Sequence, residues 1–249
     1  MMITVVSPLH NEAENVGPLI DEIVEACATL PAFEIVLVDD GSSDATNALV
    51  VERQASLENL RLIVHPKAGG QSAAVHSGVL AAEGDVVCTL DGDLQNPPAE
   101  IPNLVAPFLA DNASDRLGLV AGQRVGRQDT ASKRWASRAA NTIRAWMLDD
   151  DTRDTGCGLK AFRRDAFLQL PYFNHMHRYL PALFKRHGWD VAHVDVSHRE
   201  RGGGTSKYNN LQRAMVGAHD LIGVAWLIRR RKTASPVEHL RPDHTGEGQ

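Results

Sequence analysis

The sequence predicts an α/β fold in which a mostly parallel sheet is covered by helices on both faces. Short runs of β-branched and apolar residues alternate with segments whose apolar residues recur at helical spacing. The apolar runs lack polar alternation, which is typical of strands that are buried on both faces of a parallel sheet. These two patterns place strands and helices in alternation along the first half of the chain.

The chain begins with two strand–helix units. Residues 3–6 are a run of β-branched side chains and are expected to form the first strand. Residues 16–27 carry apolar side chains at i, i+3, i+4 and i+7, which predicts an amphipathic helix. Residues 34–38 predict the second strand, and the polar residues ahead of residues 45–54 predict a capped helix there.

The alternation continues through two more units. Residues 60–64 predict a third strand, followed by a helix over about residues 72–82. Residues 85–90 predict a fourth strand, and a short helix is expected near residues 100–109, after a pair of prolines. Residues 118–121 predict a fifth strand.

The second half of the sequence is less regular. Helices are expected at residues 132–148, 178–187 and 211–230, and strands at residues 159–162 and 191–196. The glycine-rich stretch at residues 201–207 predicts a basic loop. Residues 233–249 are polar, contain proline and glycine, and are expected to form a disordered tail.

Composition narrows the function classes. The chain has 249 residues with 26 Lys and Arg against 31 Asp and Glu, a formal charge of −5, which argues against a globally basic nucleic-acid binder. Its 3 cysteines are far apart and form no CxxC, so neither a disulfide framework nor a cysteine zinc site is expected, and the compartment should be reducing, as in the cytoplasm. No apolar stretch reaches the roughly 20 residues of a spanning helix.

Two acidic clusters follow predicted strands. Asp39-Asp40-Gly41-Ser42 comes after the second strand, and Asp91-Gly92-Asp93-Leu94-Gln95 comes after the fourth. Ligands of open α/β sheets bind outside the carboxyl ends of the strands, so both clusters are placed where a site would be. The alternative is that each is a turn or helix cap, since Asp, Gly and Ser are ordinary turn residues.

The second cluster has the chemistry of a metal site. Asp91 and Asp93 are two residues apart, so an extended loop would point both carboxylates the same way. Two carboxylates with room for water and phosphate oxygens suit Mg²⁺ or Mn²⁺.

Three motifs resemble those of family 2 glycosyltransferases with the GT-A fold. They are residues 6–12 (VSPLHNE), 38–43 (VDDGSS) and 90–98 (LDGDLQNPP). Later motifs resemble the group of this family whose acceptors are polyprenyl phosphates: residues 122–124, 127–129, 133–137, 154–164, 177–178 and 201–208, with Asn141. The resemblance covers about residues 2–230.

The resemblance implies roles for individual residues. The nucleotide-sugar site it implies consists of Pro8, His10, Glu12, Asp39, Asp40, Gly41, Ser42, Asp91, Arg201, Ser206 and Lys207. The implied metal ligands are Asp91, Asp93 and Gln95. The implied acceptor-phosphate residues are Arg124, Arg127, Lys133, Arg134 and Ser137. The implied catalytic set is Asp93, Arg124, Arg134 and Ser137, while His10 departs from the family's commoner Tyr or Phe.

The activity implied by the resemblance is metal-dependent, inverting transfer of a hexose from a GDP- or UDP-linked sugar to a dolichyl or undecaprenyl phosphate on the cytoplasmic face of a membrane. Residues 1–97 would form the nucleotide-sugar and metal half, residues 98–210 the acceptor half, and residues 211–232 a C-terminal helix. A phosphate acceptor is already an anion, so it needs cations to position it more than a general base.

Two alternatives stay open. The same fold could act on a different lipid or on a glycan hydroxyl, in which case Asp154 could serve as the base. The chain could also be a nucleotide-sugar-binding protein without turnover.

The C-terminal helix has features of a membrane-surface helix. Residues 221–228 are mostly apolar and include Trp226, and four cations follow at residues 229–232. This pattern suits an interfacial helix on an anionic membrane, and the alternative is a core helix with a charged end. We therefore expect a peripheral protein on the inner face of the membrane, acting alone, as a homo-oligomer or with a separate membrane subunit.

Overall fold

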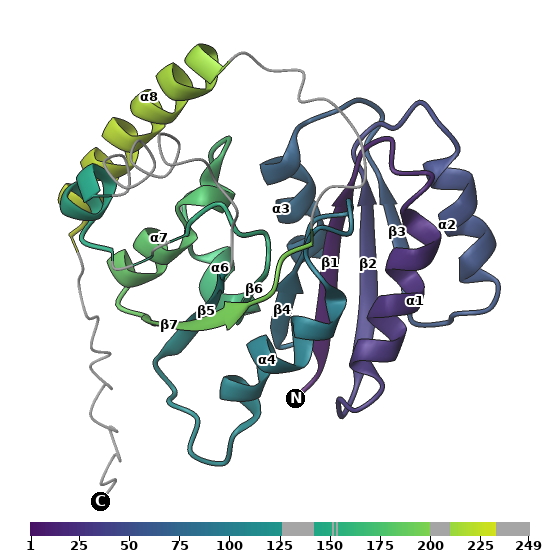
Figure 1. Cartoon of the computed structure of the whole chain (residues 1–249). Coiled ribbons are helices and arrows are strands. Elements are labelled where there is room, and N and C mark those ends of the chain that lie inside the picture. Colours follow the sequence, from purple (N-terminus) through teal and green to yellow (C-terminus); the bar gives the residue numbers. More distant parts are fainter. Residues whose placement is uncertain (126–141, 151, 153, 200–209, 233–249) are drawn as a thin grey trace, which may run out of the picture.

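A seven-stranded sheet runs through the protein in the order β3-β2-β1-β4-β6-β5-β7. The computed structural model describes residues 1–125, 142–150, 152, 154–199 and 210–232, with the side chains of the last helix described from Val216 onward. Figure 1 shows the sheet with helices on both sides. The strands are β1 (Ile3–Leu9), β2 (Phe33–Asp39), β3 (Leu60–Val64), β4 (Val86–Thr89), β5 (Leu117–Arg124), β6 (Lys160–Arg163) and β7 (Asp190–Val196).

The helices fall between the strands as expected for an α/β fold. They are α1 (Val16–Cys27), α2 (Thr46–Gln54), α3 (Gln71–Ala81), η1 (Pro98–Glu100), α4 (Ile101–Leu109), α6 (Arg164–Leu168), η2 (Met176–Arg178), α7 (Leu180–Arg186) and α8 (Asn210–Arg229). Residues 142–148 are also helical. None of the helices in the described part of the chain is long and apolar enough to cross a membrane.

The prediction of a mostly parallel sheet is confirmed, with β6 as the exception. β1, β2, β3 and β4 pair in parallel, and β5 pairs in parallel with β7. β6 is antiparallel to both β4 and β5. The chain leaves β5 and enters β6 at the same edge of the sheet, so it needs no crossover to the opposite edge between these two strands.

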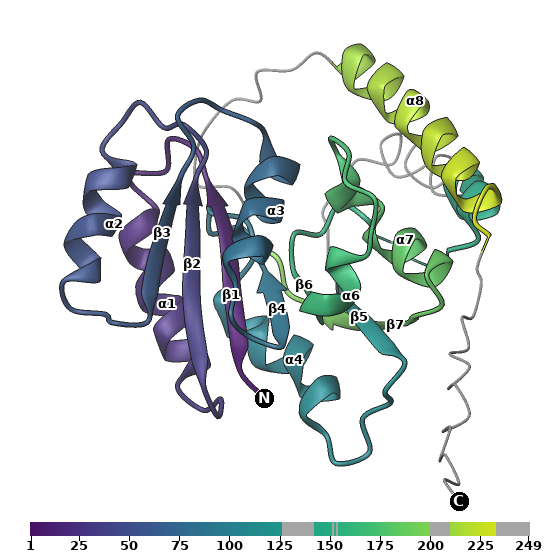
Figure 2. The same ribbon diagram turned by 180° about the vertical axis from the view of Figure 1, so that it is seen from behind.

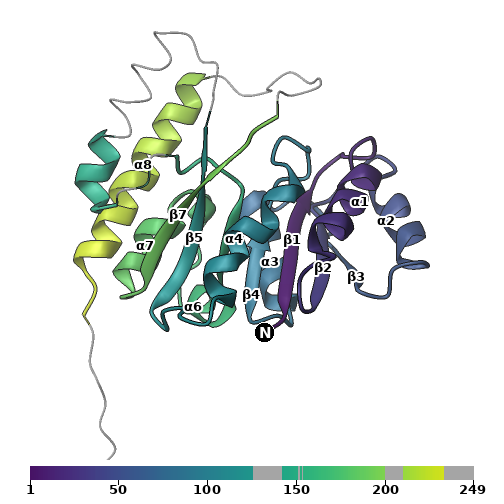
Figure 3. The same cartoon turned by 60° about the horizontal axis from the view of Figure 1, so that its bottom comes forward.

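Two apolar layers cover the two faces of the sheet. Along β2, Ile35 and Leu37 face one layer while Val36 and Val38 face the other, which explains why this strand shows no polar alternation. The first layer packs α1, α2 and α4 against the sheet, and the second packs α3, α6, α7 and the end of α8. Figures 2 and 3 show these helices on opposite sides of the strands.

The cysteines take part in the core. Cys27, Cys88 and Cys157 are all buried and free. Burial raises the pKa of Cys27 to about 12. The three cysteines therefore contribute to the apolar interior as free thiols.

Candidate active site at the carboxyl edge of the sheet

The two acidic clusters lie at the same edge of the sheet. β1, β2 and β4 are parallel neighbours, so their carboxyl ends at Leu9, Asp39 and Thr89 point to one side. The loops that follow them carry the residues with predicted roles in nucleotide and metal binding. This arrangement is the one in which open α/β sheets bind their ligands.

The loop after β1 interlocks with the loop after β2. The backbone N–H of Asn11 donates to Ser42 Oγ at 2.9 Å, and the N–H of Ser43 donates to Asn11 Oδ1 at 2.8 Å. His10 Nδ1–H donates to the carbonyl oxygen of Asp40 at 2.8 Å. These bonds hold His10 and Ser42, two residues expected at the nucleotide, in one rigid corner.

Gly41 makes the turn between the two aspartates and the serines possible. Its φ is +71°, a conformation that residues with a Cβ rarely adopt. A Cβ at this position would also lie 2.6 Å from the backbone nitrogen of Ala68. The loop after β3 therefore passes directly against the loop after β2.

Asp40 binds that neighbouring loop. Its Oδ1 accepts hydrogen bonds from Gly69 N–H at 2.8 Å and His65 Nδ1–H at 2.7 Å, and its Oδ2 accepts one from Gly70 N–H at 2.7 Å. Burial alone would raise the pKa of Asp40, but these hydrogen bonds bring it below its usual range. A carboxylate can accept about four hydrogen bonds, so Asp40 retains room for about one more donor.

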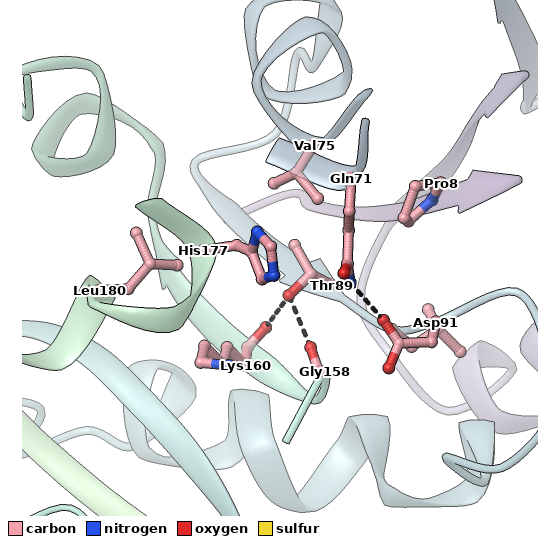
Figure 4. Close-up of a pocket in the computed structure, with 10 residues that line it drawn as sticks. Pro8, Gln71, Val75, Thr89, Asp91, Gly158, Lys160, His177 and Leu180 are labelled. Carbon is pink, nitrogen blue, oxygen red and sulfur yellow. Dashed lines mark hydrogen bonds between the residues drawn. The ribbon is translucent and has the colours of Figure 1, made fainter. Parts of the chain in front are cut away.

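Asp91 is held by two amide side chains. Gln71 Nε2 donates to its Oδ1 at 2.7 Å, and Asn96 Nδ2 donates to its Oδ2 at 2.9 Å. Figure 4 shows Gln71 reaching from α3 toward Asp91. Asp93 lies in the same loop, and its Oδ1 accepts a hydrogen bond from the N–H of Gln95 at 3.2 Å.

The two carboxylates of this loop repel each other. Burial and then the charge of Asp93 raise the pKa of Asp91, while Lys160 and Asn96 oppose the rise. A divalent cation would relieve this repulsion. The buried Oδ1 of Asn96 has no hydrogen-bond partner among the described residues.

The donor set therefore fits Mg²⁺ or Mn²⁺, although the protein does not supply a complete cage. The described residues include no group of three or more His, Cys, Asp and Glu side chains that could hold a metal. Mg²⁺ is commonly bound by one or two carboxylates together with water and substrate phosphates. Asp91 and Asp93 supply two such carboxylates.

β6 closes the site from the other side. Thr89 Oγ1 donates to the carbonyl oxygen of Gly158 at 2.9 Å, and a Cβ on Gly158 would lie 2.3 Å from Asp91 Oδ2. Lys160 is buried, its Nζ donates to the carbonyl oxygen of Cys157, and burial lowers its pKa. A glycine at position 158 is therefore required for β6 to approach Asp91 this closely.

One small pocket adjoins Asp91. Gln71, Asp91, Lys160 and His177 are among the residues that line it (Figure 4). His177 Nδ1 lies 2.7 Å from Ser72 Oγ. Burial, with a further contribution from Lys160, lowers the pKa of His177 to about 3, so its imidazole is neutral at physiological pH.

Arg124 lies at the end of β5 and pairs with Asp154. Its Nε donates to Asp154 Oδ2 at 2.6 Å, and its Nη2 donates to Asp154 Oδ1 at 2.9 Å. This hydrogen-bonded pair raises the pKa of Arg124. The loop that leads into β6 links Arg124 to the expected metal ligand: a Cβ on Gly156 would lie 3.2 Å from Arg124 Nη2, and a Cβ on Gly158 would lie 2.3 Å from Asp91 Oδ2.

The structure thus brings together the predicted site residues at positions 8–12, 39–42, 91–95 and 124. The remaining predicted residues lie outside the described part of the chain: Arg127, Lys133, Arg134, Ser137, Arg201, Ser206 and Lys207. Four site residues were not expected from the sequence: His65, Gln71, Asn96 and Lys160. The sequence held a signal for two of them. Asn96 follows Asp91 in the same short loop, and Gln71 directly follows two glycines at the same sheet edge, so both could have been identified by their positions.

Comparison with known proteins gives a family match over most of the chain. Residues 4–170 match the family model described as glycosyl transferase family 2. An undecaprenyl-phosphate 4-deoxy-4-formamido-L-arabinose transferase from Pectobacterium carotovorum is 35% identical over 212 residues, covering 84% of this chain and 63% of the relative. The protein with the same description from Yersinia pestis (strain Pestoides F) is 36% identical over 222 residues, covering 88% of this chain and 66% of the relative. The chain therefore spans just under two thirds of the length of these curated relatives.

The fold is shared with solved glycosyltransferase structures. Glucosyl-3-phosphoglycerate synthase from Mycobacterium tuberculosis, crystallised with Mn²⁺, uridine diphosphate and phosphoglyceric acid, superposes with a TM-score of 0.67 at 22% identity. The match covers 94% of this chain and 80% of the synthase. The predicted GT-A architecture is confirmed by this likeness.

Proposed function

Since the chain belongs to glycosyltransferase family 2, we propose that it transfers a hexose from a nucleotide-sugar to a polyprenyl phosphate, with inversion at the sugar carbon. One observation carries this proposal: the loop that leads into β6 contacts both Arg124 and Asp91, since a Cβ on Gly156 would lie 3.2 Å from Arg124 Nη2 and a Cβ on Gly158 would lie 2.3 Å from Asp91 Oδ2. A carboxylate pair suits a metal-bound diphosphate, and an arginine suits a second phosphate. The site therefore combines features for two phosphorylated substrates.

The donor would lie across the loops after β1, β2 and β4. The corner formed by His10 and Ser42 would hold the nucleoside, and Asp91, Asp93 and Gln95 would hold Mg²⁺ or Mn²⁺ with the diphosphate. The bound cation would offset the negative charge that develops on the leaving diphosphate. Solved neighbours contain uridine diphosphate and Mn²⁺, which makes UDP-sugars the first donors to test, with GDP-sugars second.

The acceptor proposal rests on charge and on the relatives. Arginine binds phosphate with two parallel hydrogen bonds, and Arg124 is held in place by Asp154. Arg127, Lys133, Arg134 and Ser137 are proposed to complete the acceptor-phosphate site. The curated relatives are described as undecaprenyl-phosphate transferases, which supports a polyprenyl phosphate as the acceptor class.

The alternative hypothesis is transfer to a hydroxyl acceptor with Asp154 as general base. It is less well supported. Both carboxylate oxygens of Asp154 already accept hydrogen bonds from Arg124. If Asp154 took a proton from an acceptor, its carboxylate would become neutral and would lose the charge that pairs with Arg124. A phosphate acceptor makes no such demand, because it is already an anion.

A polyprenyl phosphate is anchored in a membrane, so the reaction is proposed to take place at a membrane surface, on the cytoplasmic face. There the nucleotide-sugar meets the lipid phosphate. The cytoplasmic face and the peripheral attachment are part of this proposal, and the lipid acceptor named for the relatives supports the membrane surface.

A direct assay tests the proposal. The protein is incubated with Mn²⁺ or Mg²⁺, a short-chain polyprenyl phosphate and single UDP- or GDP-sugars, and glycolipid is sought by mass spectrometry. The panel includes hexoses and, because of the names of the relatives, a 4-formamido-arabinose donor. A new sugar phosphodiester supports the proposal. Sugar transfer to a glycan hydroxyl alone, or binding of nucleotide without turnover on any acceptor, would contradict it.

A further inference from the structure

Four large apolar side chains on two neighbouring helices are more than half exposed. On the helix of residues 142–148, Ile143 is 55% exposed and Trp146 is 80% exposed. On α8, Ile222 is 64% exposed and Trp226 is 57% exposed. We call these four residues the two-helix apolar surface. Figure 3 shows the short helix beside α8, at the end of the molecule opposite α2.

The exposed side chains lie on defined faces of the two helices. Ile222 and Trp226 are four residues apart and share one face of α8, while Val224 and Ala225 are buried against the core. Ile143 and Trp146 are three residues apart, while Arg144 and Leu148 of the same helix are buried. Each helix therefore packs one face against the protein and leaves an apolar face exposed.

A groove joins the two helices and ends in positive charge. It is lined by Met147, Ile222, Ala225, Trp226, Arg229 and Arg230. The Arg230 guanidinium lies 6.0 Å from the centre of the Trp226 ring. Arg229, Arg230, Arg231 and Lys232 follow one another without an intervening acid. Of the acids nearby, Asp220 is hydrogen-bonded to His175 at 2.8 Å and Asp149 is exposed.

We propose that the two-helix apolar surface is where the protein docks on an anionic lipid bilayer. Tryptophan favours the boundary between headgroups and acyl chains, because its ring is apolar and its N–H is polar. Basic residues beside the apolar face attract anionic headgroups. The exposed tryptophans and the basic residues lie side by side on this surface. The positive charge is complementary to anionic headgroups, which favours a bilayer over a neutral partner.

This inference rests on the proposed function, because a polyprenyl phosphate acceptor lies in a membrane. It adds a second helix to the docking element. The sequence pattern of α8 predicts a membrane-surface helix there, but nothing in the sequence predicts that the helix of residues 142–148 lies beside it and lines the same groove through Met147.

Vesicle sedimentation with the full chain tests the inference. Vesicles of phosphatidylcholine are compared with vesicles that also contain phosphatidylglycerol, at low and high salt. Wild-type protein should sediment with the anionic vesicles, and less so in high salt. The double variant Trp146→Ser/Trp226→Ser should lose at least about tenfold in partitioning, since two large apolar groups no longer leave water.

Two further variants sharpen the result. Val51→Ser removes a side chain on α2 that is 53% exposed and should sediment like the wild type. Arg229→Gln/Arg230→Gln should weaken binding to anionic vesicles at least about fivefold and leave the weak binding to neutral vesicles unchanged. This variant also provides a second test if the tryptophan variant unfolds, which circular dichroism would reveal.

Three results would overturn the inference. The wild type could stay in solution with anionic vesicles, or the tryptophan variant could sediment like the wild type. The third result is that the wild type forms a dimer, which the tryptophan variant abolishes while it still binds vesicles. The transferase assay with a water-soluble, short-chain acceptor separates the two proposals. Turnover there without vesicle binding overturns only the docking surface, and vesicle binding without turnover overturns only the proposed function.

Discussion

Arg124 and Asp154 form a two-bond ion pair, with N–O distances of 2.6 and 2.9 Å, between the end of β5 and the loop that leads into β6. A guanidinium has five N–H donors, so the pair fixes the orientation of Arg124 and leaves donors for a phosphate. Gly156 leaves space beside it, since a Cβ there would lie 3.2 Å from Arg124 Nη2. Asp154 is therefore best described as a residue that positions Arg124.

A double-mutant cycle tests this role. Arg124→Ala should lower kcat/KM for the acceptor by at least about tenfold, because an interaction worth about 1.4 kcal/mol or more is lost. Asp154→Asn should lower it in the same direction, and the double variant should lose little more than Arg124→Ala alone, since both act on one contact. Steady-state kinetics with varied acceptor measures all three losses.

The binding of nucleotide serves as the control for this cycle. Calorimetry should show near-normal affinity for UDP or GDP in each variant. Additive losses would show that Arg124 and Asp154 act independently. A collapse of nucleotide affinity with normal acceptor use would show that Arg124 serves the donor instead.

The metal site predicts a large effect at Asp93. Asp93→Asn removes one of the two carboxylates that repel each other in this loop, so it should weaken Mn²⁺ binding and lower turnover more than tenfold. Electron paramagnetic resonance measures the free Mn²⁺, and the transferase assay measures turnover. Asp111→Asn, at an exposed aspartate in the loop after α4, is the matched control. Near-normal activity of Asp93→Asn, or full activity of the wild type in excess EDTA, would exclude a metal-dependent reaction.

Gly158 provides a steric test of the same site. Gly158→Ala would place a methyl group 2.3 Å from Asp91 Oδ2, so Asp91 or β6 must move. We expect weaker Mn²⁺ binding and at least about a tenfold loss of turnover, with a far-ultraviolet circular dichroism spectrum like that of the wild type. Gly17→Ala in α1 is the control, because nothing lies within 4 Å of its added Cβ. Wild-type metal affinity in Gly158→Ala would mean that the close approach does not matter.

The buried position of His177 predicts that the folded state loses stability in acid. Burial lowers the pKa of His177 from 6.5 to about 3, so between these values the unfolded state binds a proton that the folded state does not. Stability should therefore fall as the pH is lowered through this window, with His177 contributing up to about 1.4 kcal/mol per pH unit. Urea denaturation between pH 6 and pH 4 measures the free energy of unfolding. This free energy should depend less steeply on pH for His177→Gln than for the wild type. The control is His219→Gln, at an exposed histidine. If the free energy of unfolding changes equally steeply with pH in His177→Gln and the wild type, the expectation is contradicted.

The sheet and its helices were largely predictable because burial imposes strong periodicity. The third strand lies at residues 60–64 as expected, and α1 spans the expected residues Val16–Cys27. The expected helix at residues 178–187 starts later, with the 3₁₀ turn η2 ahead of Leu180. The short helix α6 was not predicted, since five residues are too few to show a helical period.

The site was predictable only where function leaves a local motif. Asp91 and Asp93 belong to one short loop, so spacing alone placed them together. Gln71 donates a hydrogen bond to Asp91 from α3, and Lys160 opposes the rise in the pKa of Asp91 from β6; both effects depend on tertiary packing. The direction of β6, which brings Lys160 there, also follows from packing.

The reversed direction of β6 has an evolutionary consequence. Its register with β4 places Lys160 opposite Thr89, so the beginning of β6 lies at the ligand-binding edge. The segment between β5 and β6 therefore leaves the sheet and returns to it at that edge. Such a segment can be lengthened, shortened or exchanged between relatives as a cassette, provided that the four-residue pairing of β6 is kept. New acceptor specificities could thus arise by recombination of one contiguous stretch of sequence, while the nucleotide-binding units are inherited unchanged.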